Sequence, residues 1–328
     1  MTPTLSSPSR RAAEWIESQM NPDGSLRGAT SINEYYKTVF ALTCAGRRVA
    51  AERMLNHIVG RYLQKNGDLD GTGNPWWDQF RIYCHGWVAM AAIELARFDI
   101  SERILDFLED FHDPKTGGFF GTVQERDSRG EQEMMTTGVL AVAMLWGGRV
   151  DLARRVAGWF ERVWAAQPAL ERGLYFVWHA RNGLVTEFPA ETAVSHWVNP
   201  REKTQWYFQY GIPAAFLSAF SGAVQEPRWL ELGQKYLHAS RHAGEERYST
   251  PQSGKIGWGA AWTYRLSGDE KDRALVATVL RGLQSNQSAE GWWPGQAAYG
   301  NQKAVNPLPS LDITGEFAAL TSWMEPYA

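Results

Sequence analysis

The sequence predicts an all-α protein, an α6/α6 toroid in which six outer helices surround six inner ones, and three observations support this prediction. Helical patterns are abundant in the 328 residues, whereas strand patterns are sparse. The helical segments alternate between those with one charged face and those that are apolar and rich in small residues. A helix that is apolar on all sides is buried, so the second set should form the inner wall.

The elements follow in order along the chain. Amphipathic outer helices are expected at 9–19, 50–63, 101–111, 151–166, 227–241 and 270–285. Apolar inner helices are expected at 32–45, 80–96, 133–146, 205–220, 255–266 and 313–323. Each outer helix precedes one inner helix, so the chain reads as a helix-pair repeat that closes into one domain, 1–328.

The connections that enter the inner helices are long and rich in turn residues, whereas those that leave them are short. The longest, 167–204, contains LYFVWHARNGLVTEF, in which two β-rich runs flank Arg-Asn-Gly and predict a small hairpin. In a toroid the long connections emerge on one face, where loops commonly build the mouth of a site. We therefore expect 167–204 to be a lid-like insertion.

One position recurs in every inner helix, about eleven residues before the helix ends. It reads Tyr35-Tyr36, His85-Gly86, Thr137-Gly138, Tyr210-Gly211, Ile256-Gly257 and Thr314-Gly315. Glycine costs roughly 1 kcal/mol relative to alanine inside a helix, so its recurrence needs a reason. We interpret the glycines as places where crowded inner helices approach closely, and we expect the residue before each glycine to point into a central cavity.

The composition argues against several classes of function. A net charge of -3 with mixed signs and no basic stripe argues against a nucleic-acid partner. No apolar run approaches the ~18 residues that span a bilayer, and the first residues lack an apolar leader, so we expect a cytoplasmic protein without a membrane partner. The two cysteines exclude a disulfide framework. The 16 tryptophans instead suggest an aromatic pocket for a small molecule.

Several turns resemble those of known toroids. The segments WIESQMNPDGSLRG, DPKTGGFFG and LQSNQSAEGWWPG are similar to the "Q…G…W/F" turns of terpene cyclase and prenyltransferase-like proteins. The helix-pair rhythm is also similar to that of N-acylglucosamine 2-epimerase-like and unsaturated glucuronyl hydrolase-like barrels. The resemblance implies the toroid fold along nearly the whole chain. It implies no activity, because a fold hosts many functions and the D-x-D-D, D-D-x-x-D and zinc-ligand patterns of those families are absent.

Five residues are candidates for catalysis: His85, Asp78, Glu133, Tyr210 and Glu316. Asp78 and His85 lie seven residues apart on one helical face and would suit an acid–base pair on a cavity wall. Glu133, one turn before Thr137, would have a raised pKa if tryptophans exclude water from it. These three residues also have structural interpretations. His85 could be a packing histidine, Asp78 a charge at a helix N-terminus and Glu133 a helix cap.

A second group of residues is expected to bind the substrate on the same wall. Its members are Tyr35, Tyr36, Lys37, Trp77, Arg81, Thr137, Trp206, Tyr207, Gln209, Trp258 and Asp312. Lys37 is a lone cation in an apolar stretch and could hold a carboxylate or an enolate oxygen, although a lysine near a helix end also reaches solvent readily. Asp312 could equally be an N-cap.

Together these features favour a cofactor-independent lyase, isomerase or cyclase that uses general acid–base catalysis on a small, largely apolar substrate, terpenoid or polyketide-like. A sugar epimerase or glycosidase-like barrel is the alternative enzyme, because tryptophan stacking and paired carboxylates fit it as well. A non-catalytic binding scaffold is the third possibility. No cofactor or metal is expected, and the sequence does not indicate an oligomeric state.

Overall fold

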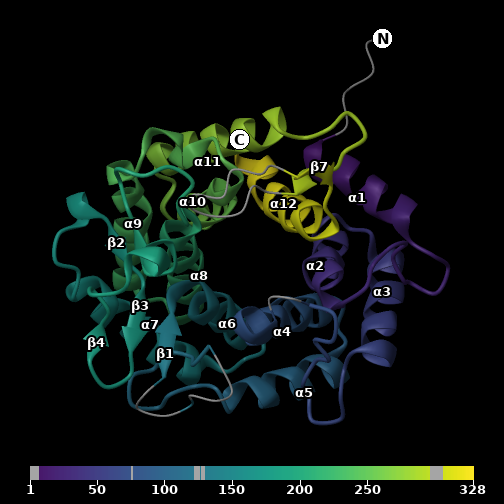
Figure 1. The fold of residues 1–328 in the computed structure, drawn as a ribbon, viewed down its shortest axis with the longest axis horizontal. Helices are drawn as coiled ribbons and strands as arrows, with labels where there is room; N and C mark the ends of the chain where they lie inside the picture. Colours follow the sequence, from purple (N-terminus) through teal and green to yellow (C-terminus); the bar gives the residue numbers. More distant parts are fainter. Residues whose placement is uncertain (1–6, 75–76, 122–125, 127–129, 296–305) are drawn as a thin grey trace.

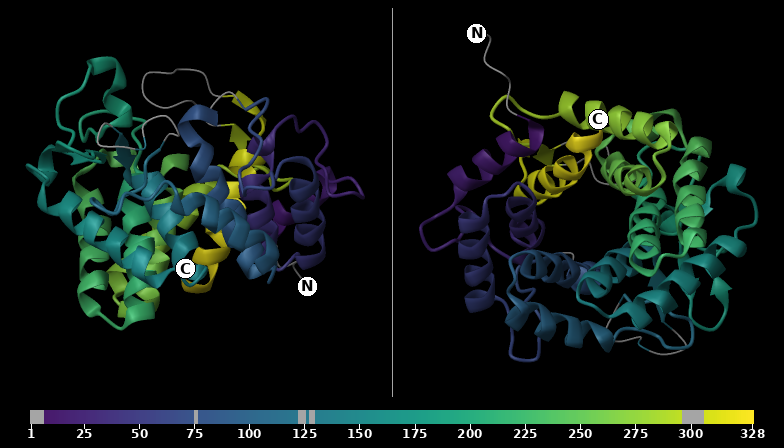
Figure 2. Two further views of the ribbon diagram at one scale, coloured as in Figure 1. Left: turned by 90° about the horizontal axis from the view of Figure 1, so that it is seen from below. Right: turned by 180° about the vertical axis from the view of Figure 1, so that it is seen from behind.

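Twelve long helices form two concentric rings in a computed structural model that describes residues 7–74, 77–121, 126, 130–295 and 306–328. Figure 1 looks along the ring axis, and Figure 2 shows the ring from below and from behind. Each inner helix packs against the next, and α12 packs against α2, so the ring closes on itself. The predicted all-α toroid is confirmed.

The alternation of outer and inner helices follows the chain as predicted. The outer ring consists of α1 (Pro8–Gln19), α3 (Arg48–Arg61), α5 (Phe98–Glu109), α7 (Val150–Ala165), α9 (Pro227–Ala239) and α11 (Glu270–Ser285). The inner ring consists of α2 (Tyr36–Cys44), α4 (Trp77–Glu94), α6 (Met134–Trp146), α8 (Phe208–Val224), α10 (Gly254–Ser267) and α12 (Leu311–Met324). The inner helices are apolar on nearly every side because neighbours cover both of their faces: in α6 every residue from Met134 to Leu145 is buried.

Short elements occupy the connections. The strands are β1 (Glu131–Glu133), β2 (Leu174–Tyr175), β3 (Val177–His179), β4 (Gly183–Leu184), β5 (Trp197–Val198), β6 (Pro294–Gly295) and β7 (Asn306–Pro309). The 3-10 turns are η1 (Ile32–Glu34), η2 (Leu170–Arg172), η3 (Ala190–Ser195), η4 (Ser240–His242), η5 (Glu245–Tyr248), η6 (Pro251–Ser253) and η7 (Glu325–Tyr327). All pairings among these strands are antiparallel, in the orders β1-β3-β4, β2-β5 and β6-β7. The predicted hairpin is β3–β4, with Trp178 opposite Leu184.

The recurrent glycines lie where inner helices touch. A Cβ atom at Gly211 would lie 1.9 Å from the Lys255 carbonyl oxygen in α10, and one at Gly315 would lie 2.9 Å from Thr38 Cα in α2. No side chain fits at such distances, so only glycine allows these helices to approach this closely. This part of the interpretation is confirmed.

The first residue of the recurring pair does not behave as predicted at four of the six positions. Its side chain there accepts a hydrogen bond from a backbone N–H of the connection that enters the inner helix. These latch residues are Tyr35, His85, Thr137 and Thr314, and the donors are Leu26 at 3.0 Å, Leu69 at 2.9 Å, Phe119 at 3.3 Å and Trp293 at 3.0 Å.

Ring contacts show that the latch residues face the outer layer. The Tyr35 ring stacks on His57 of α3 at 5.2 Å between centroids, and the His85 ring stacks on Phe107 of α5 at 5.0 Å. The prediction that these side chains point into the ring is therefore wrong for the latch residues. They fasten the long connections onto the helices, which satisfies backbone N–H groups that would otherwise be buried without a partner.

Candidate functional site

Four charged side chains meet where α2, α10 and α12 adjoin. The Lys37 Nζ atom lies 2.7 Å from Glu316 Oε2 and 3.0 Å from Asp312 Oδ1, and Lys255 forms an ion pair with the other oxygen of Glu316. We call Lys37, Lys255, Asp312 and Glu316 the charged cluster. Lys37 is 6% exposed, Lys255 3% and Glu316 7%, whereas the Asp312 side chain is 21% exposed and faces solvent in part.

The helices bring these groups together at one end of the ring. Lys37 and Lys255 lie in the first turns of α2 and α10, and Asp312 lies in the first turn of α12 with Glu316 one turn further along. Ser310 begins α12 by accepting a hydrogen bond from the backbone N–H of Ile313 at 3.2 Å. Residues four apart share a helix face, so both carboxylates of α12 reach the same lysine.

The location of the cluster is costly for two reasons. The N-terminal turns of helices carry partial positive charge, which disfavours an ammonium group there. Burial of an ion costs several kcal/mol in addition, and only a well-placed partner offsets that cost. Glu316 offsets it for both lysines, because it lies between them and binds each with a different oxygen. An arrangement that packing alone disfavours is a candidate functional site.

Aromatic rings surround the cluster. The Lys37 Nζ atom lies 5.1 Å from the ring centroid of Tyr36 and 6.0 Å from that of Tyr83, and the Lys255 Nζ atom lies 5.2 Å from that of Phe208. Aromatic faces stabilise cations at such distances. The site thus combines fixed charges with flat apolar walls.

The interior of the ring narrows beyond the cluster. Trp87 of α4 and Trp258 of α10 lie on opposite sides of the ring, yet their ring centroids are only 6.3 Å apart. Trp87 follows Tyr83 by one helical turn, and Trp258 follows Lys255 by three residues. The two tryptophans therefore form an apolar floor under the charged cluster.

The charges of the cluster affect its pKa values in different directions. Burial alone would raise the pKa of Glu316, but Lys255 and Lys37 outweigh it and lower the value to about 2. Burial alone would lower the pKa of Lys37, but Asp312 and Glu316 hold it well above the usual range of lysine. Burial lowers the pKa of Lys255, and the Lys37 ammonium lowers it further. The Glu316 carboxylate opposes both effects but does not return this pKa to the usual value of lysine. Lys255 is thus the cation of the cluster that releases its proton more readily.

A second polar contact lies on the neighbouring helices. Glu133 is the N-cap of α6: its carboxylate accepts hydrogen bonds from the N–H groups of Met135 at 2.7 Å and Thr136 at 2.9 Å. Gln209 of α8 donates its amide N–H to the same carboxylate. Burial raises the pKa of Glu133, although these hydrogen bonds oppose the shift. The capping interpretation of Glu133 is what the contacts show.

The predicted Asp78–His85 pair does not form on the wall of the ring. Asp78 is exposed in the first turn of α4, whereas His85 is fully buried. The Nδ1–H group of His85 donates to the Arg81 carbonyl oxygen at 2.8 Å, and Nε2 accepts from the Leu69 N–H group at 2.9 Å and lies 3.1 Å from Asp68 Oδ1. The carboxylate beside His85 is therefore that of Asp68 and not that of Asp78, which corrects the expected geometry.

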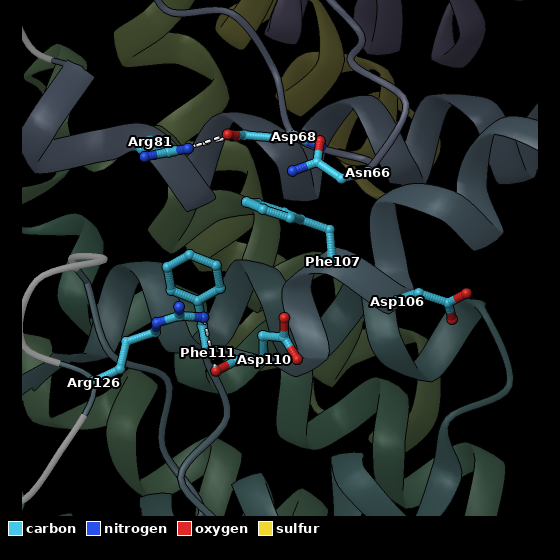
Figure 3. A pocket seen from close by; sticks show the side chains of 8 residues that line it. All are labelled: Asn66, Asp68, Arg81, Asp106, Phe107, Asp110, Phe111 and Arg126. Atoms are coloured by element: carbon cyan, nitrogen blue, oxygen red, sulfur yellow. Dashed lines mark hydrogen bonds and ion pairs between the residues drawn. The ribbon is translucent and has the colours of Figure 1, made fainter.

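Arg81 and Trp77 belong to the same outer region. Arg81 forms an ion pair with Asp68, and the Trp77 ring lies 6.0 Å from that of His85. A cavity of about 450 Å³ opens here between α4, α5 and the connection after α3, and Figure 3 shows Arg81 joined to Asp68 beside the ring of Phe107. This cavity lies outside the inner ring and is separate from the charged cluster.

Other predicted binding residues contact the connections before α8 and α10. The Trp206 ring stacks on Phe176 at 5.6 Å. The Tyr207 hydroxyl donates to Glu246 at 3.2 Å. Tyr210 is buried, and burial raises its pKa. Tyr35 and Thr137 are latch residues.

Of the predicted site residues, the structure brings Lys37, Asp312 and Glu316 together with Tyr36, and it places Trp258 in the apolar floor. Lys255 and Tyr83 are not among the residues predicted from the sequence. A signal for Lys255 exists, because it is a lone cation in the apolar, glycine-rich stretch SGKIGWG. Within the described residues, no three metal-ligating side chains gather closely enough to hold an ion, and no helix is both long and apolar enough to cross a membrane.

No protein-family model matches the chain, and neither does any curated protein sequence. Solved structures match along nearly its whole length. A D-mannose isomerase covers 98% of this chain and 96% of its own, with a TM-score of 0.71 and 12% identity.

Two other kinds of enzyme share the architecture. The GH76A alpha-1,6-mannanase from Salegentibacter sp. HEL1_6 has a TM-score of 0.67 at 11% identity and covers 98% of this chain and 99% of its own. The type II terpene cyclase MstE from Scytonema, in complex with merosterolic acid A, has a TM-score of 0.59 at 12% identity and covers 98% and 97%. The chain therefore has the α/α-toroid fold of the terpene cyclase-like and epimerase-like proteins that its turns resemble, and at these identities the likeness concerns the fold alone.

Proposed function

We propose that this protein is a cofactor-independent enzyme, an isomerase, lyase or cyclase, that moves a proton on a small substrate bearing a carbonyl group. The observation that carries the proposal is the buried chain Lys37–Glu316–Lys255, which joins three neighbouring inner helices at the end where the long connections enter. Three solved structures with the same fold come from enzymes, which supports a catalytic function for this ring.

Each member of the charged cluster has a different role in the proton transfer. As a free amine, Lys255 accepts a proton from the carbon next to the substrate carbonyl, and the electron pair of the broken C–H bond moves onto the carbonyl oxygen. The ammonium group of Lys37 stabilises the enolate oxygen that results. Glu316 holds both lysines in position, and Asp312 links Lys37 to solvent.

The fate of the enolate decides the class of reaction. Return of the proton from Lys255 to a different carbon gives an isomer, and departure of a β-substituent with the electron pair gives a lyase product. Attack of the enolate carbon on a second carbonyl closes a ring; the π electrons of that carbonyl move onto its oxygen, which takes back the proton from Lys255. Each outcome uses the same first step, so the proposal rests on that step.

The walls favour a substrate with an apolar body. Tyr36, Tyr83, Trp87 and Trp258 offer flat surfaces next to the charges. A pure hydrocarbon would bury the lysines without a polar partner from the ligand, which costs free energy. A polyketide-like chain supplies both carbonyl oxygens and apolar carbon, so it fits better than a terpenoid hydrocarbon. We further propose the connection 167–204 as a lid, because the β1–β3 pairing attaches it to the start of α6 at this end.

Open-chain sugars form the second candidate substrate class. An aldose also carries a proton next to a carbonyl, and two carboxylates lie one turn apart on α12. Both carboxylates bind Lys37, however, so neither is free to act as the acid of a glycosidase. A sugar reaction at this site would therefore be an isomerisation through the lysines.

Hydrogen exchange with heavy water tests the proposal. The protein would be incubated in D2O with β-diketones, β-keto esters and aldoses, and proton NMR would follow deuterium incorporation next to the carbonyl. We expect exchange into at least one class and a loss of about a hundredfold in Lys255→Met. Lys235→Met, an exposed lysine on α9, is the matched control and should keep the full rate. Equal rates in both variants, or no exchange into any substrate, would overturn the proposal.

A further inference from the structure

A second cavity lies inside the ring at the opposite end. Its volume is about 270 Å³, and Phe40, Trp146 and Trp323 line it together with Cys44 and Glu94. Cys44 follows Lys37 by seven residues on α2, and Trp323 follows Glu316 by seven on α12. Seven residues of helix span roughly 10 Å, so this cavity is two helical turns from the charged cluster.

Aromatic rings form the walls of this cavity. Trp146 lies 6.1 Å from Phe40 and 6.1 Å from Trp323 between ring centroids, so the three rings are consecutive walls. Trp262 stacks behind Trp323 at 5.0 Å and supports it. Trp146 and Trp323 are only partly buried. The faces of such rings carry negative electrostatic potential and attract cations.

The backbone adds negative charge to the same place. Four inner helices end around the cavity: α2 at Cys44, α4 at Glu94, α6 at Trp146 and α12 at Met324. The C-terminus of a helix carries partial negative charge and favours a cation. Four such ends around one hollow reinforce each other.

Glu94 adds a carboxylate to this end of the ring. It is the last residue of α4, it is exposed, and it lines the cavity. No lysine or arginine among the described residues forms an ion pair with it. The Cys44 thiol contributes no charge, because burial raises its pKa to about 12. The cavity thus offers one carboxylate, three aromatic walls and four helix ends of the same sign, and its lining contains no cation.

We propose that this cavity binds a small organic cation, a quaternary or fully methylated ammonium group. Rings and a single carboxylate suit a soft, weakly hydrated cation, whereas a metal ion needs several oxygen or nitrogen ligands. A volume of about 270 Å³ admits a head group of choline size. The binding site is separate from the charged cluster and does not depend on the function proposed for it.

A charged ligand and its uncharged twin test the inference. Choline and 3,3-dimethylbutan-1-ol have the same shape but differ in charge, and titration of each into the full chain would be followed by tryptophan fluorescence and calorimetry. We expect saturable binding of choline and affinity at least about tenfold weaker for the alcohol. Equal affinities for the two, or no binding of choline, would overturn the inference.

Two variants locate the site. Glu94→Gln should weaken choline binding by about fivefold or more, whereas Glu161→Gln, an exposed glutamate on outer helix α7, should leave it unchanged. Trp323→Leu should abolish the fluorescence response and the calorimetric signal. Choline binding that all three variants retain would place the ligand elsewhere and refute the assignment. Deuterium exchange at the charged cluster should stay at the wild-type rate in Glu94→Gln.

Discussion

The two ends of the inner ring differ in how their charged side chains relate to the helix dipoles. At the C-terminal end, the aromatic cavity and Glu94 add to a field that is already negative, so that end is ready for a cation from outside. At the N-terminal end, Lys37 and Lys255 lie in helix turns of positive potential and are buried as well. The first end follows the helix dipoles, whereas the second opposes them.

Under the proposed function, the N-terminal end is the one that does chemistry. A charge that agrees with the local field is easily accommodated, so it needs no compensation from the rest of the fold. Charges that oppose the field are retained at a cost in stability, and Glu316 is the group that offsets this cost. Such a site is expected where function, rather than stability, sets the choice of residues.

The largest effect should follow from breaking the charged cluster. Glu316→Gln leaves Lys255 buried without a carboxylate partner, so we expect a loss of about 3–5 kcal/mol in the free energy of unfolding, measured by urea denaturation. The triple variant Lys37→Met, Lys255→Met, Glu316→Leu removes all three charges and should regain most of that stability while it loses activity. A triple variant as unstable as Glu316→Gln would show that the cluster stabilises the fold.

Acid should remove the stabilisation that comes from the ionised Glu316 carboxylate. The pKa of Glu316 is about 2 in the folded protein against 4.5 for an ordinary glutamate, so between these values the unfolded chain binds more protons. The stabilisation is complete above about pH 4.5 and is lost as the pH falls toward 2, by roughly 3 kcal/mol. Urea unfolding should show that the gap in free energy of unfolding between wild type and Glu316→Gln is smaller at about pH 3 than at about pH 5. A gap that stays constant would contradict the assigned shift, and Glu161→Gln serves as the control.

The latch residues should matter for stability only. His85→Ala removes the acceptor of the Leu69 N–H group and the ring that stacks on Phe107, so we expect a loss of about 2–3 kcal/mol in the free energy of unfolding. Urea denaturation measures this loss, and Asp78→Asn is the exposed control on the same helix. A stability equal to wild type would show that the latch carries little energy.

A smaller effect should appear at the latch of α12. Thr314→Val keeps the shape of the side chain but leaves the Trp293 N–H group without its acceptor, which should cost about 1–2 kcal/mol. Thr278 on α11 is only partly buried and its hydroxyl donates to the Ala274 carbonyl oxygen of the same helix, so Thr278→Val should stay within about 0.5 kcal/mol of wild type. Thermal melts of the two variants would separate these outcomes, and equal melting temperatures would argue against a latch at this position.

The sequence predicted the architecture well because helix amphipathicity is a local property. The alternation of charged and apolar segments located the twelve helices, with ends that shifted by a few residues, as in α8 (predicted 205–220, observed Phe208–Val224). The glycine register was also correct, because it reports contact between neighbouring helices.

The direction of the side chains was harder to predict. The latch position faces the outer layer, and the inward position lies two residues later, roughly 200° around the helix. Trp87, Trp258 and Glu316 occupy that inward position. Helical periodicity alone does not tell the two positions apart, because each latch residue is held by a connection whose N–H group lies 9 to 21 residues earlier in the chain.

The charged cluster shows the same limit more strongly. Its ion pairs join Lys37 to Glu316 and Lys255 to Glu316, and the second pair is separated by 61 residues. Lys37, Asp312 and Glu316 could be singled out as charges in apolar helices, but their pairing depends on ring closure between α12 and α2. Long-range pairing of this kind is visible only in the folded chain.

One measurement compares the two positions directly: the rate of deuterium exchange into the best substrate, determined side by side for Lys255→Met and His85→Ala, each below its own melting temperature. If the charged cluster carries out the reaction, the exchange rate should fall about a hundredfold in Lys255→Met and stay within about twofold of wild type in His85→Ala. The reverse result, with His85→Ala inactive and Lys255→Met active, would contradict the account and move the chemistry to the outer side of α4.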